Sequence, residues 1–410
     1  MQSIICVDLT KIELSGEKDL SRKYNVGIYT WAISRNYGTC LQAYALQKYI
    51  DSLGNNACIF IPFIKSDSFI LNFGRTIKRI ADRGLYKYKK KNYAKLNENY
   101  SRFINNFDKL YYCLSPNDFD GIKVFLTGSD QLWNPNHLDK GVSFLEFGGN
   151  RPRFAYSTSI GVDDIPNELR DKYKRNIGRF QNIGMREELA VTVIKNILKD
   201  DCERINVQKV LDPTFLLRKA DWMTIADNAN IQQAIPDEYL FCYLLGDNEE
   251  YSKMLKLVWE QSGVKNLVIV QSAENSCFKV HGAISYNDVG PMEFVKLLLG
   301  AKIIITDSFH CSAISINNNK DFWEFLRFDD NDSASQNSRI YELLDDFGLR
   351  DRLIRNYESA LNMMKEAGAI SKSIDYNNVN NLLEKNRKES EDFLENALSR
   401  AIRSYESGKS

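Results

Sequence analysis

Short apolar runs alternate with segments of helical periodicity along most of this 410-residue chain. The first clear unit is a strand at residues 26–31, a loop, a helix that begins at Thr39, and a second strand at residues 57–62. Thr39 and Gln42 have the spacing of a capping box at the start of that helix. Because such units connect parallel strands by right-handed crossovers, we predict an α/β fold built on doubly wound sheets.

The alternation continues far beyond this unit. Further strands are predicted from apolar runs at residues 124–127, 154–157, 239–245, 266–271, 302–306 and 322–326. Further helices are predicted at residues 168–180, 249–261 and 291–299, with another that ends near residue 198. A chain of this length exceeds one ordinary hydrophobic core, so we expect two domains.

The regular apolar spacing lapses and the charge rises near residues 200–208. We therefore place an N-terminal Rossmann-like domain at residues 1–203 and a C-terminal Rossmann-like domain at residues 204–370. Residues 371–410 have the pattern of a charged amphipathic helix, which we expect to pack back on the first domain. The predicted architecture is two Rossmann-like domains that face each other across a cleft.

Composition argues against several classes of function. The 54 basic and 54 acidic residues give zero formal net charge, which does not indicate a nucleic-acid-binding protein. No apolar run approaches the roughly 20 residues that cross a bilayer, and the first 25 residues lack the apolar core of a secretory signal. We therefore expect a cytoplasmic protein. Eight dispersed Cys without C-x-x-C pairs, and three His without H-E-x-x-H, predict neither disulfides nor a metal site.

One segment, residues 65–99, departs from this neutral balance. Nine Lys and Arg residues crowd between residues 75 and 95, with Asp82 as the only acidic residue among them. A solvated helical face accounts for such a pattern. The alternative is docking onto an anionic membrane surface or a diphosphate lipid, which would make the protein peripheral on the inner face of the membrane.

The segment from Thr306 to Ala313 carries the strongest candidate for a functional residue. It follows the apolar run 303–305 and leads into a short helical start at residues 313–316. His310 therefore lies between the carboxyl end of a strand and the amino end of a helix. Ligands of open α/β sheets bind at such places, and helix amino ends attract anions. A histidine that merely caps the helix is the alternative.

Two other candidates occupy similar junctions. Arg186 precedes the helix that ends near residue 198, and its guanidinium could bind a carboxylate or phosphate bidentately. The alternative for Arg186 is an ion pair with Glu187 or Glu188. Asp130 follows the predicted strand at residues 124–127. It either accepts a proton or a hydrogen bond from a substrate hydroxyl group, or caps a turn.

Four motifs occur in order along the chain. They are Val-Gly-Ile-Tyr-Thr-Trp at 26–31 with Asn-Tyr-Gly at 36–38 and Leu-Gln-Ala-Tyr-Ala-Leu-Gln at 41–47, Gly-Ser-Asp-Gln-Leu-Trp-Asn at 128–134, Met-Arg-Glu at 185–187, and Thr-Asp-Ser-Phe-His at 306–310. Together, over residues 26–349, they resemble the polysaccharide pyruvyl transferase family. The resemblance implies a two-domain fold similar to that of GT-B glycosyltransferases.

The resemblance also implies an activity. Members of the family move the enolpyruvyl unit of phosphoenolpyruvate onto a hexose of a bacterial exopolysaccharide, capsule or cell-wall precursor, often lipid-linked, forming a pyruvate ketal and releasing phosphate. Phosphoenolpyruvate would be a co-substrate, with no further cofactor, and the C-terminal domain would be the donor side. His310 matches the family's catalytic histidine, and imidazole suits general acid–base work near neutral pH. Arg186 would bind the donor.

The Asn36-Tyr37-Gly38 loop is a further candidate for binding. Its backbone N–H groups could hold a donor phosphate, with Gly38 permitting close approach. Alternatively, the loop binds the acceptor sugar, with Tyr37 or Trp31 as a stacking face. Trp133 invites the same acceptor role, although an aromatic residue there is more often part of the core.

One position departs from the family's pattern. Several members carry Arg two residues before the motif histidine, where this chain has Ser308. We assign Ser308 to the donor site, which leaves one positive charge missing there. Arg35, Arg339 or Lys302 could replace that charge.

Two other functions share this architecture. A GT-B-type glycosyltransferase would need a nucleotide-sugar pocket in the C-terminal half, where no G-x-G-x-x-G occurs. A non-catalytic carbohydrate-binding protein would keep the fold without the chemistry. The presence of both Arg186 and His310 weighs against this second alternative.

Overall fold

The structure is a computed structural model that describes most of the chain. The described residues are 24–32, 36–62, 98–103, 110–113, 119, 121–138, 142–246, 248–271, 280–329, 335–366 and 368–408. Residues 65–97 of the basic segment, and Arg35, lie outside these ranges. The membrane-docking role expected of that segment therefore stays a prediction.

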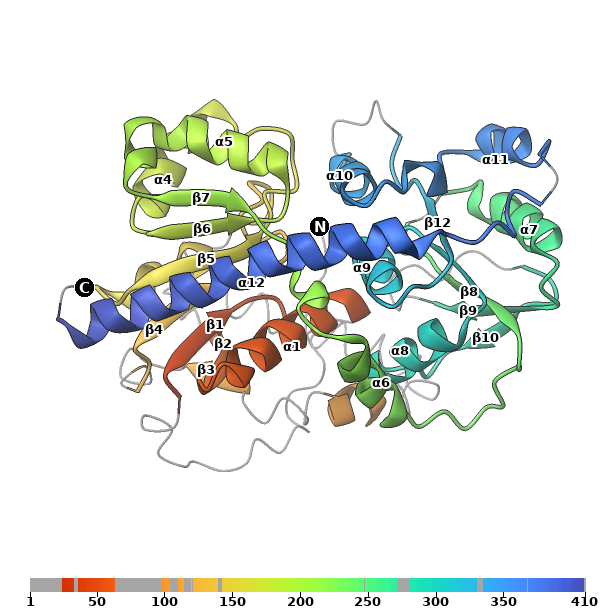
Figure 1. Cartoon of the computed structure of the whole chain (residues 1–410), viewed down its shortest axis with the longest axis horizontal. Coiled ribbons are helices and arrows are strands. Elements are labelled where there is room, and N and C mark those ends of the chain that lie inside the picture. The colour runs from red at the N-terminus through yellow and green to blue at the C-terminus, as the bar shows by residue number, and fades with distance from the viewer. Residues whose placement is uncertain are drawn as a thin grey trace, which may run out of the picture.

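Two parallel sheets form the framework of the molecule (Figure 1). The first has the order β3-β2-β1-β4-β5-β6-β7, and the second has the order β10-β9-β8-β11-β12-β13. The strands of the first sheet are β1 (Val26–Tyr29), β2 (Ala57–Pro62), β3 (Leu110–Cys113), β4 (Val124–Thr127), β5 (Arg153–Thr158), β6 (Asn182–Met185) and β7 (Asn206–Lys209). Those of the second sheet are β8 (Tyr239–Tyr243), β9 (Asn266–Val270), β10 (Ile284–Tyr286), β11 (Ile303–Thr306), β12 (Phe322–Phe325) and β13 (Leu353–Ile354). All paired neighbours are parallel, and in each sheet the strand order reverses once, as in a doubly wound fold.

The predicted α/β fold with two Rossmann-like domains is confirmed. The central strands β1, β4, β8 and β11 are buried along their whole length, because parallel strands are covered on both faces. The sequence did not reveal the four edge strands, β3, β7, β10 and β13, nor β6, which lies next to an edge of the first sheet. Because β7 pairs with β6, the first sheet extends beyond the division expected at residue 203.

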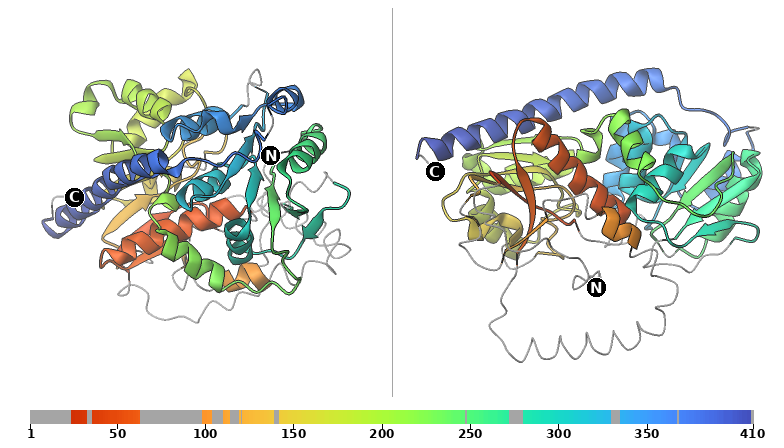
Figure 2. Two further views of the ribbon diagram at one scale, coloured as in Figure 1. Left: turned by 45° about the vertical axis from the view of Figure 1, so that its right-hand side comes forward. Right: turned by 90° about the horizontal axis from the view of Figure 1, so that it is seen from below.

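Helices connect the strands and cover the sheets (Figures 1 and 2). They are α1 (Tyr37–Ser52), α4 (Asn167–Ile177), α5 (Glu188–Leu198), α6 (Lys219–Asp227), α7 (Tyr251–Ser262), α8 (Pro291–Gly300), α9 (Phe309–Asn317), α10 (Ser338–Asp346), α11 (Tyr357–Met363) and α12 (Tyr376–Glu406). Short 3-10 helices are η5 (Val142–Phe144), η6 (Glu146–Gly148), η7 (Lys199–Glu203), η8 (Pro213–Phe215) and η9 (Arg350–Arg352).

Helix α1 begins two residues earlier than the sequence suggested. Asn36 caps it by accepting a hydrogen bond from the Gly38 N–H at 3.0 Å. The expected capping box of Thr39 and Gln42 is absent, since the Thr39 hydroxyl donates to Asp130 Oδ2 at 3.0 Å instead. The first turn of α1 is thereby tied to the end of β4.

The long helix α12 crosses both domains (Figures 1 and 2). It contacts β4 and β5 of the first sheet, where Phe393 and Leu394 are buried. Its Arg387 donates from Nε to the carbonyl of Phe215 at 2.7 Å and from Nη2 to Asn317 Oδ1 at 2.6 Å. Helix α12 therefore fastens the linker between the two sheets to α9.

The carboxyl ends of strands from both sheets meet where the domains touch. Gln131, just after β4, has its side-chain amide 2.9 Å from that of Gln336, just before α10. The N–H of Glu188, at the start of α5, donates to Glu342 Oε2 of α10 at 2.6 Å. The residues at these strand ends are therefore shared between the domains.

Candidate active site

His310 lies in the first turn of α9, at the carboxyl end of β11. The helix begins at Phe309 rather than Ala313, so the imidazole is close to the helix amino end. Only 6% of the His310 side chain is exposed. A Cβ built on Gly38 would lie 2.5 Å from both the Cβ and the Nδ1 of His310. Gly38 therefore lets the first turns of α1 and α9 pack directly against each other.

The substitution Gly38→Ala tests this contact. At an exposed helical position, Gly→Ala would stabilise the folded protein by about 1 kcal/mol. Here the added methyl group collides with the imidazole of His310. We expect a loss of about 1–3 kcal/mol in the free energy of unfolding. Urea denaturation measures it, with Lys48→Ala, at an exposed position of α1, as the control. A Gly38→Ala protein as stable as the wild type would contradict the packing described.

Arg186 follows β6, and only 1% of its side chain is exposed. Nε donates to Glu187 Oε1 at 3.1 Å, and Nη1 donates to Asp212 Oδ2 at 3.3 Å. The guanidinium Cζ lies 4.3 Å from the centre of the Phe309 ring. Burial lowers the pKa of Arg186, but nearby carboxylates, Glu187 foremost, outweigh burial and raise it. The ion pair between Arg186 and Glu187, one of the alternatives considered above, is therefore formed. Asp212 is a second carboxylate partner of the same guanidinium.

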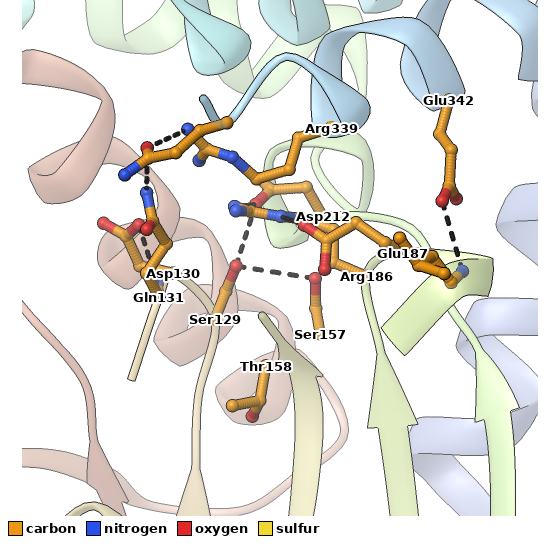
Figure 3. Close-up of polar contacts among 12 residues, drawn as sticks. Ser129, Asp130, Gln131, Ser157, Thr158, Arg186, Glu187, Asp212, Arg339 and Glu342 are labelled. Carbon is orange, nitrogen blue, oxygen red and sulfur yellow. Dashed lines mark hydrogen bonds and ion pairs between the residues drawn. The ribbon is translucent and has the colours of Figure 1, made fainter. Parts of the chain in front are cut away.

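Asp212 lies in the linker between the sheets, where it pairs with Arg186 (Figure 3). It also contacts His310, so it joins the two residues. Its Oδ2 accepts from the Ser129 hydroxyl at 2.8 Å and lies 3.5 Å from His310 Nε2. Its Oδ1 accepts from the N–H and the hydroxyl of Thr214, at 3.0 and 2.8 Å. Burial raises the pKa of the Asp212 carboxyl group, but His310 and Arg186 outweigh burial and hold that pKa below its usual range. Asp212 is therefore ionised at neutral pH.

The structure thus brings together two residues that the sequence singled out. Arg186 follows a strand of the first sheet and His310 follows a strand of the second, and both lie beside the same oxygen of Asp212. Sequence reasoning missed Asp212, because an Asp before Pro213 resembles an ordinary helix cap. It does cap η8, and only the tertiary structure reveals its second set of contacts.

Asp130 is buried at the end of β4 with a left-handed backbone, φ 75°. Its Oδ1 accepts from the Gln131 N–H at 2.9 Å, which agrees with the turn-capping alternative. Its Oδ2 accepts from the Thr39 hydroxyl. Asp130 also contributes to raising the pKa of Arg186, so its charge belongs to the same cluster. Its role as a proton acceptor stays a prediction.

The loop expected to hold a phosphate makes other contacts. The Gly38 N–H already donates to Asn36 Oδ1, so it is not free to bind an anion. Tyr37 is 3% exposed, stacks on Phe294 and donates its hydroxyl to the carbonyl of Val289 at 3.0 Å. The expectation that Tyr37 offers a sugar-stacking face does not hold, because its ring is enclosed among those of Tyr100, Tyr243 and Phe294. The loop instead packs the domains together.

The two tryptophans differ in their surroundings. Trp133 has no exposed surface, donates from Nε1 to the carbonyl of Ser143 at 3.0 Å, and packs on Phe144. It is a core residue, so the expected acceptor role of Trp133 does not hold. Trp31 is half-buried, and its ring meets His137 edge-to-face with the ring centres 6.2 Å apart. Trp31 therefore stays a candidate for contact with a sugar.

The remaining residues of the His310 motif have structural contacts. Ser308 is buried at the N-cap of α9, and its place in the donor site stays a prediction. Asp307 accepts from the N–H groups of Leu245 and Gly246, at 2.6 and 2.7 Å. It also accepts from Arg327 Nε at 3.2 Å. Asp307 therefore fixes the loops at the carboxyl edge of the second sheet.

Of the three cations considered for the missing charge, Arg339 is the one seen in this region. Arg35 lies outside the described residues. Lys302 precedes β11 at its amino end, is half exposed, and pairs with Glu238 at 2.8 Å. Arg339, in the first turn of α10, is buried and lines a small pocket together with Arg186.

The cluster is rich in arginine, which suits carboxylate or phosphate groups. The part of the chain that the structure describes contains no group of three or more His, Cys, Asp or Glu placed to hold a metal ion. Within the same ranges, no helix combines the length and the apolar character needed to span a bilayer.

Comparison of the sequence with protein families and with curated proteins gives two results. The family described as polysaccharide pyruvyl transferase matches residues 36–323. That range contains Gly38, Asp130, Arg186, Asp212 and His310. Among curated proteins, none matches the sequence significantly.

Solved structures resemble the chain along most of its length. The UDP-N-acetylglucosamine 2-epimerase from Rickettsia bellii aligns with a TM-score of 0.51 and 9% identity, over 93% of this chain and 98% of that chain. The UDP-GlcNAc 2-epimerase from Methanocaldococcus jannaschii aligns with a TM-score of 0.48 and 10% identity, over 87% of this chain and 95% of that chain. At such low identity the first likeness shows the GT-B-like fold alone.

Proposed function

The chain belongs to the polysaccharide pyruvyl transferase family, and from this premise we propose that it moves the enolpyruvyl unit of phosphoenolpyruvate onto a hexose. The acceptor in this proposal is a bacterial surface polysaccharide precursor, either a glycan or a lipid-linked oligosaccharide. The product is a pyruvate ketal that bridges two hydroxyl groups of the hexose, and phosphate is released.

One observation carries the proposal. An imidazole and a guanidinium from different sheets lie beside one buried carboxylate, with Asp212 Oδ2 3.5 Å from His310 Nε2 and 3.3 Å from Arg186 Nη1. The pairing supplies a proton-transfer group next to an anion-binding group. An enol phosphate requires both, because its methylene carbon must gain a proton while its anionic groups are held.

The reaction balances as follows. Two hydroxyl groups of the hexose form bonds to the central carbon of phosphoenolpyruvate, while the bond from that carbon to the phosphate oxygen breaks. Of the two protons released by the hydroxyl groups, one ends on the methylene carbon, which becomes a methyl group. The other leaves on the phosphate. The site therefore needs an acid, a base and at least one cation.

The residues of the cluster match these needs. His310 is the proposed acid, with the negative charge of Asp212 opposite a protonated imidazole. Asp130 is the proposed acceptor of a hydroxyl proton. Arg186 offers its Nη2, which is buried and has no hydrogen-bond partner among the described residues. An anionic oxygen of the donor would satisfy that group.

Phosphate release tests the proposal directly. The protein is incubated with phosphoenolpyruvate and a panel of hexose-containing lipid-linked glycans, and released phosphate is measured together with the ketal methyl group by NMR. We expect one phosphate per ketal formed with a suitable acceptor. Phosphate release without a ketal, or no release with any acceptor, would contradict the proposal. Transfer from a nucleotide sugar in the same panel would favour a glycosyltransferase.

A further inference from the structure

Arg339 differs from two other buried arginines near the domain boundary, Arg186 and Arg327, in its charge partners. Arg186 pairs with Glu187 at 3.1 Å, and Arg327 pairs with Asp307 at 3.2 Å. No carboxylate among the described residues forms an ion pair with Arg339, which is only 9% exposed. Its positive charge therefore lacks a direct ion-pair partner there, although the charges of Glu187 and Asp130 act on it from a distance.

Neutral amides hold Arg339 in place of carboxylates (Figure 3). Nη2 donates to Gln336 Oε1 at 2.7 Å. With its side-chain amide turned by half a rotation, Gln131 presents its oxygen 3.0 Å from Nη1. Nε is buried without any hydrogen-bond partner in the described part of the chain. The two amides therefore fix the orientation of the guanidinium, while its Nε–H group has no acceptor among the described residues.

The surroundings make this arrangement unfavourable in the free protein. Burial, followed by the charge of Arg186, lowers the pKa of Arg339 to about 9, and the charges of Glu187 and Asp130 offset this only in part. A guanidinium stays protonated at neutral pH even so. A buried cation without a counter-ion destabilises the folded state, and folds retain such groups where a ligand supplies the missing charge.

The position of Arg339 indicates which ligand that is. Arg339 comes from α10 of the second domain, and Arg186 follows β6 of the first; both line the same small pocket. Each has one buried nitrogen without a partner among the described residues, Nε in Arg339 and Nη2 in Arg186. Glu187 and Asp212 pair directly with Arg186, whereas Arg339 has no direct ion pair among the described residues and is the better placed of the two to attract an anion.

We infer that Arg339 is a donor-binding residue that, with Arg186, binds a carboxylate or phosphate group of phosphoenolpyruvate across the domain boundary. This inference rests on the proposed function. In it, Arg339 of α10 is the second cation of the donor site. Because the two guanidinium groups belong to different domains, the bound anion also holds the domains together.

The substitution Arg339→Met tests the inference, because it removes the charge and keeps most of the side-chain volume. We expect the KM for phosphoenolpyruvate to rise at least tenfold, with a smaller change in kcat. The melting temperature of the ligand-free protein should stay the same or rise, since a buried charge without a direct ion pair is removed. The matched control is Arg350→Met, because Arg350 is more exposed and paired with Asp345. That variant should keep the wild-type KM.

Two results for Arg339→Met would contradict donor binding by Arg339. An unchanged KM, or a variant that melts well below the wild type or fails to fold, would overturn the inference, because Arg339 would then serve the fold. Arg339→Lys keeps the charge without the planar fork, so we expect a KM between those of wild type and Arg339→Met. Full loss of donor binding in the lysine variant with unchanged melting would still support a bidentate contact.

Thermal-shift titrations distinguish contact with the phosphate group from contact with the carboxylate group of phosphoenolpyruvate. Together with turnover measurements, they also distinguish the binding inference from the proposed function. Inorganic phosphate, pyruvate and phosphoenolpyruvate are each added to wild type and to Arg339→Met. Loss of the phosphate shift indicates contact with the phosphate group, and loss of the pyruvate shift indicates contact with the carboxylate. If the wild type binds phosphoenolpyruvate but never releases phosphate, the proposed function fails and the binding inference stands. If the wild type turns over and the variant keeps its KM, only the inference fails.

Discussion

Replacing His310 by Gln is expected to lower kcat by about 10²-fold or more, because glutamine cannot exchange the proton that the methylene carbon must gain. Glutamine also approximates the shape of the imidazole beside Gly38, so the packing of α1 on α9 should survive. The measurement is the rate of phosphate release at saturating phosphoenolpyruvate and acceptor.

His281→Gln is the control for this prediction, since His281 is exposed. It should turn over at the wild-type rate. A His310→Gln protein with wild-type kcat would remove His310 from the chemistry. In that case its contact with Asp212 would be a packing feature of the domain boundary.

Replacing Asp212 by Ala is expected to lower the free energy of unfolding by about 3–5 kcal/mol. Asp212 has no exposed side-chain surface. Its loss leaves Arg186 with one fewer carboxylate and the Ser129 hydroxyl with only the 3.4 Å contact to Ser157 Oγ. The Thr214 N–H also loses its cap. Urea denaturation of both proteins measures the difference, provided that the slope of the transition is unchanged. Asp237→Ala, at an exposed position, is the control and should leave the midpoint unchanged.

The stability that Asp212 contributes should also depend on pH. Its pKa in the folded protein is held below the usual range, so it binds its proton less readily when folded than when unfolded. The contribution is therefore fully present above about pH 4, the ordinary value for Asp, and is lost as the pH falls towards the folded pKa. The gap in stability between wild type and Asp212→Asn should shrink as the pH is lowered below about 4. A gap that widens with acid would show that Asp212 is not ionised in the folded state.

The central strands of each sheet could be predicted from the sequence, but the edges and β6 beside one of them could not. Strands such as β4 and β11 consist of apolar residues buried on both faces, which produces an unbroken apolar run. Edge strand β7 has an exposed Asn206 and only partly buried residues beyond Val207, so its sequence lacks that signal. The first sheet therefore continues past the division placed at residue 203.

In the site, too, the sequence revealed residues with a local signal and missed those that depend on tertiary contacts. His310 could be found because it follows a predicted strand, and Arg186 because it precedes a predicted helix. These local signals require no knowledge of the partner domain. Tyr37 and Trp133 occupy similar junctions, yet they point into the protein, and sequence spacing does not distinguish an enclosed ring from an accessible one. Asp212 depends on contacts from both domains, so no local pattern could identify it.

Helix α12 has a consequence for how the protein is made. Its residues leave the ribosome after every strand of both sheets has been synthesised. Until then, the surface of the first sheet that Phe393 and Leu394 will cover is open to water, and Phe215 lacks the bond from Arg387. The N-terminal domain therefore cannot complete its folding during translation as an independent unit. A nascent chain that stops short of this helix would expose an apolar surface of the kind that chaperones recognise.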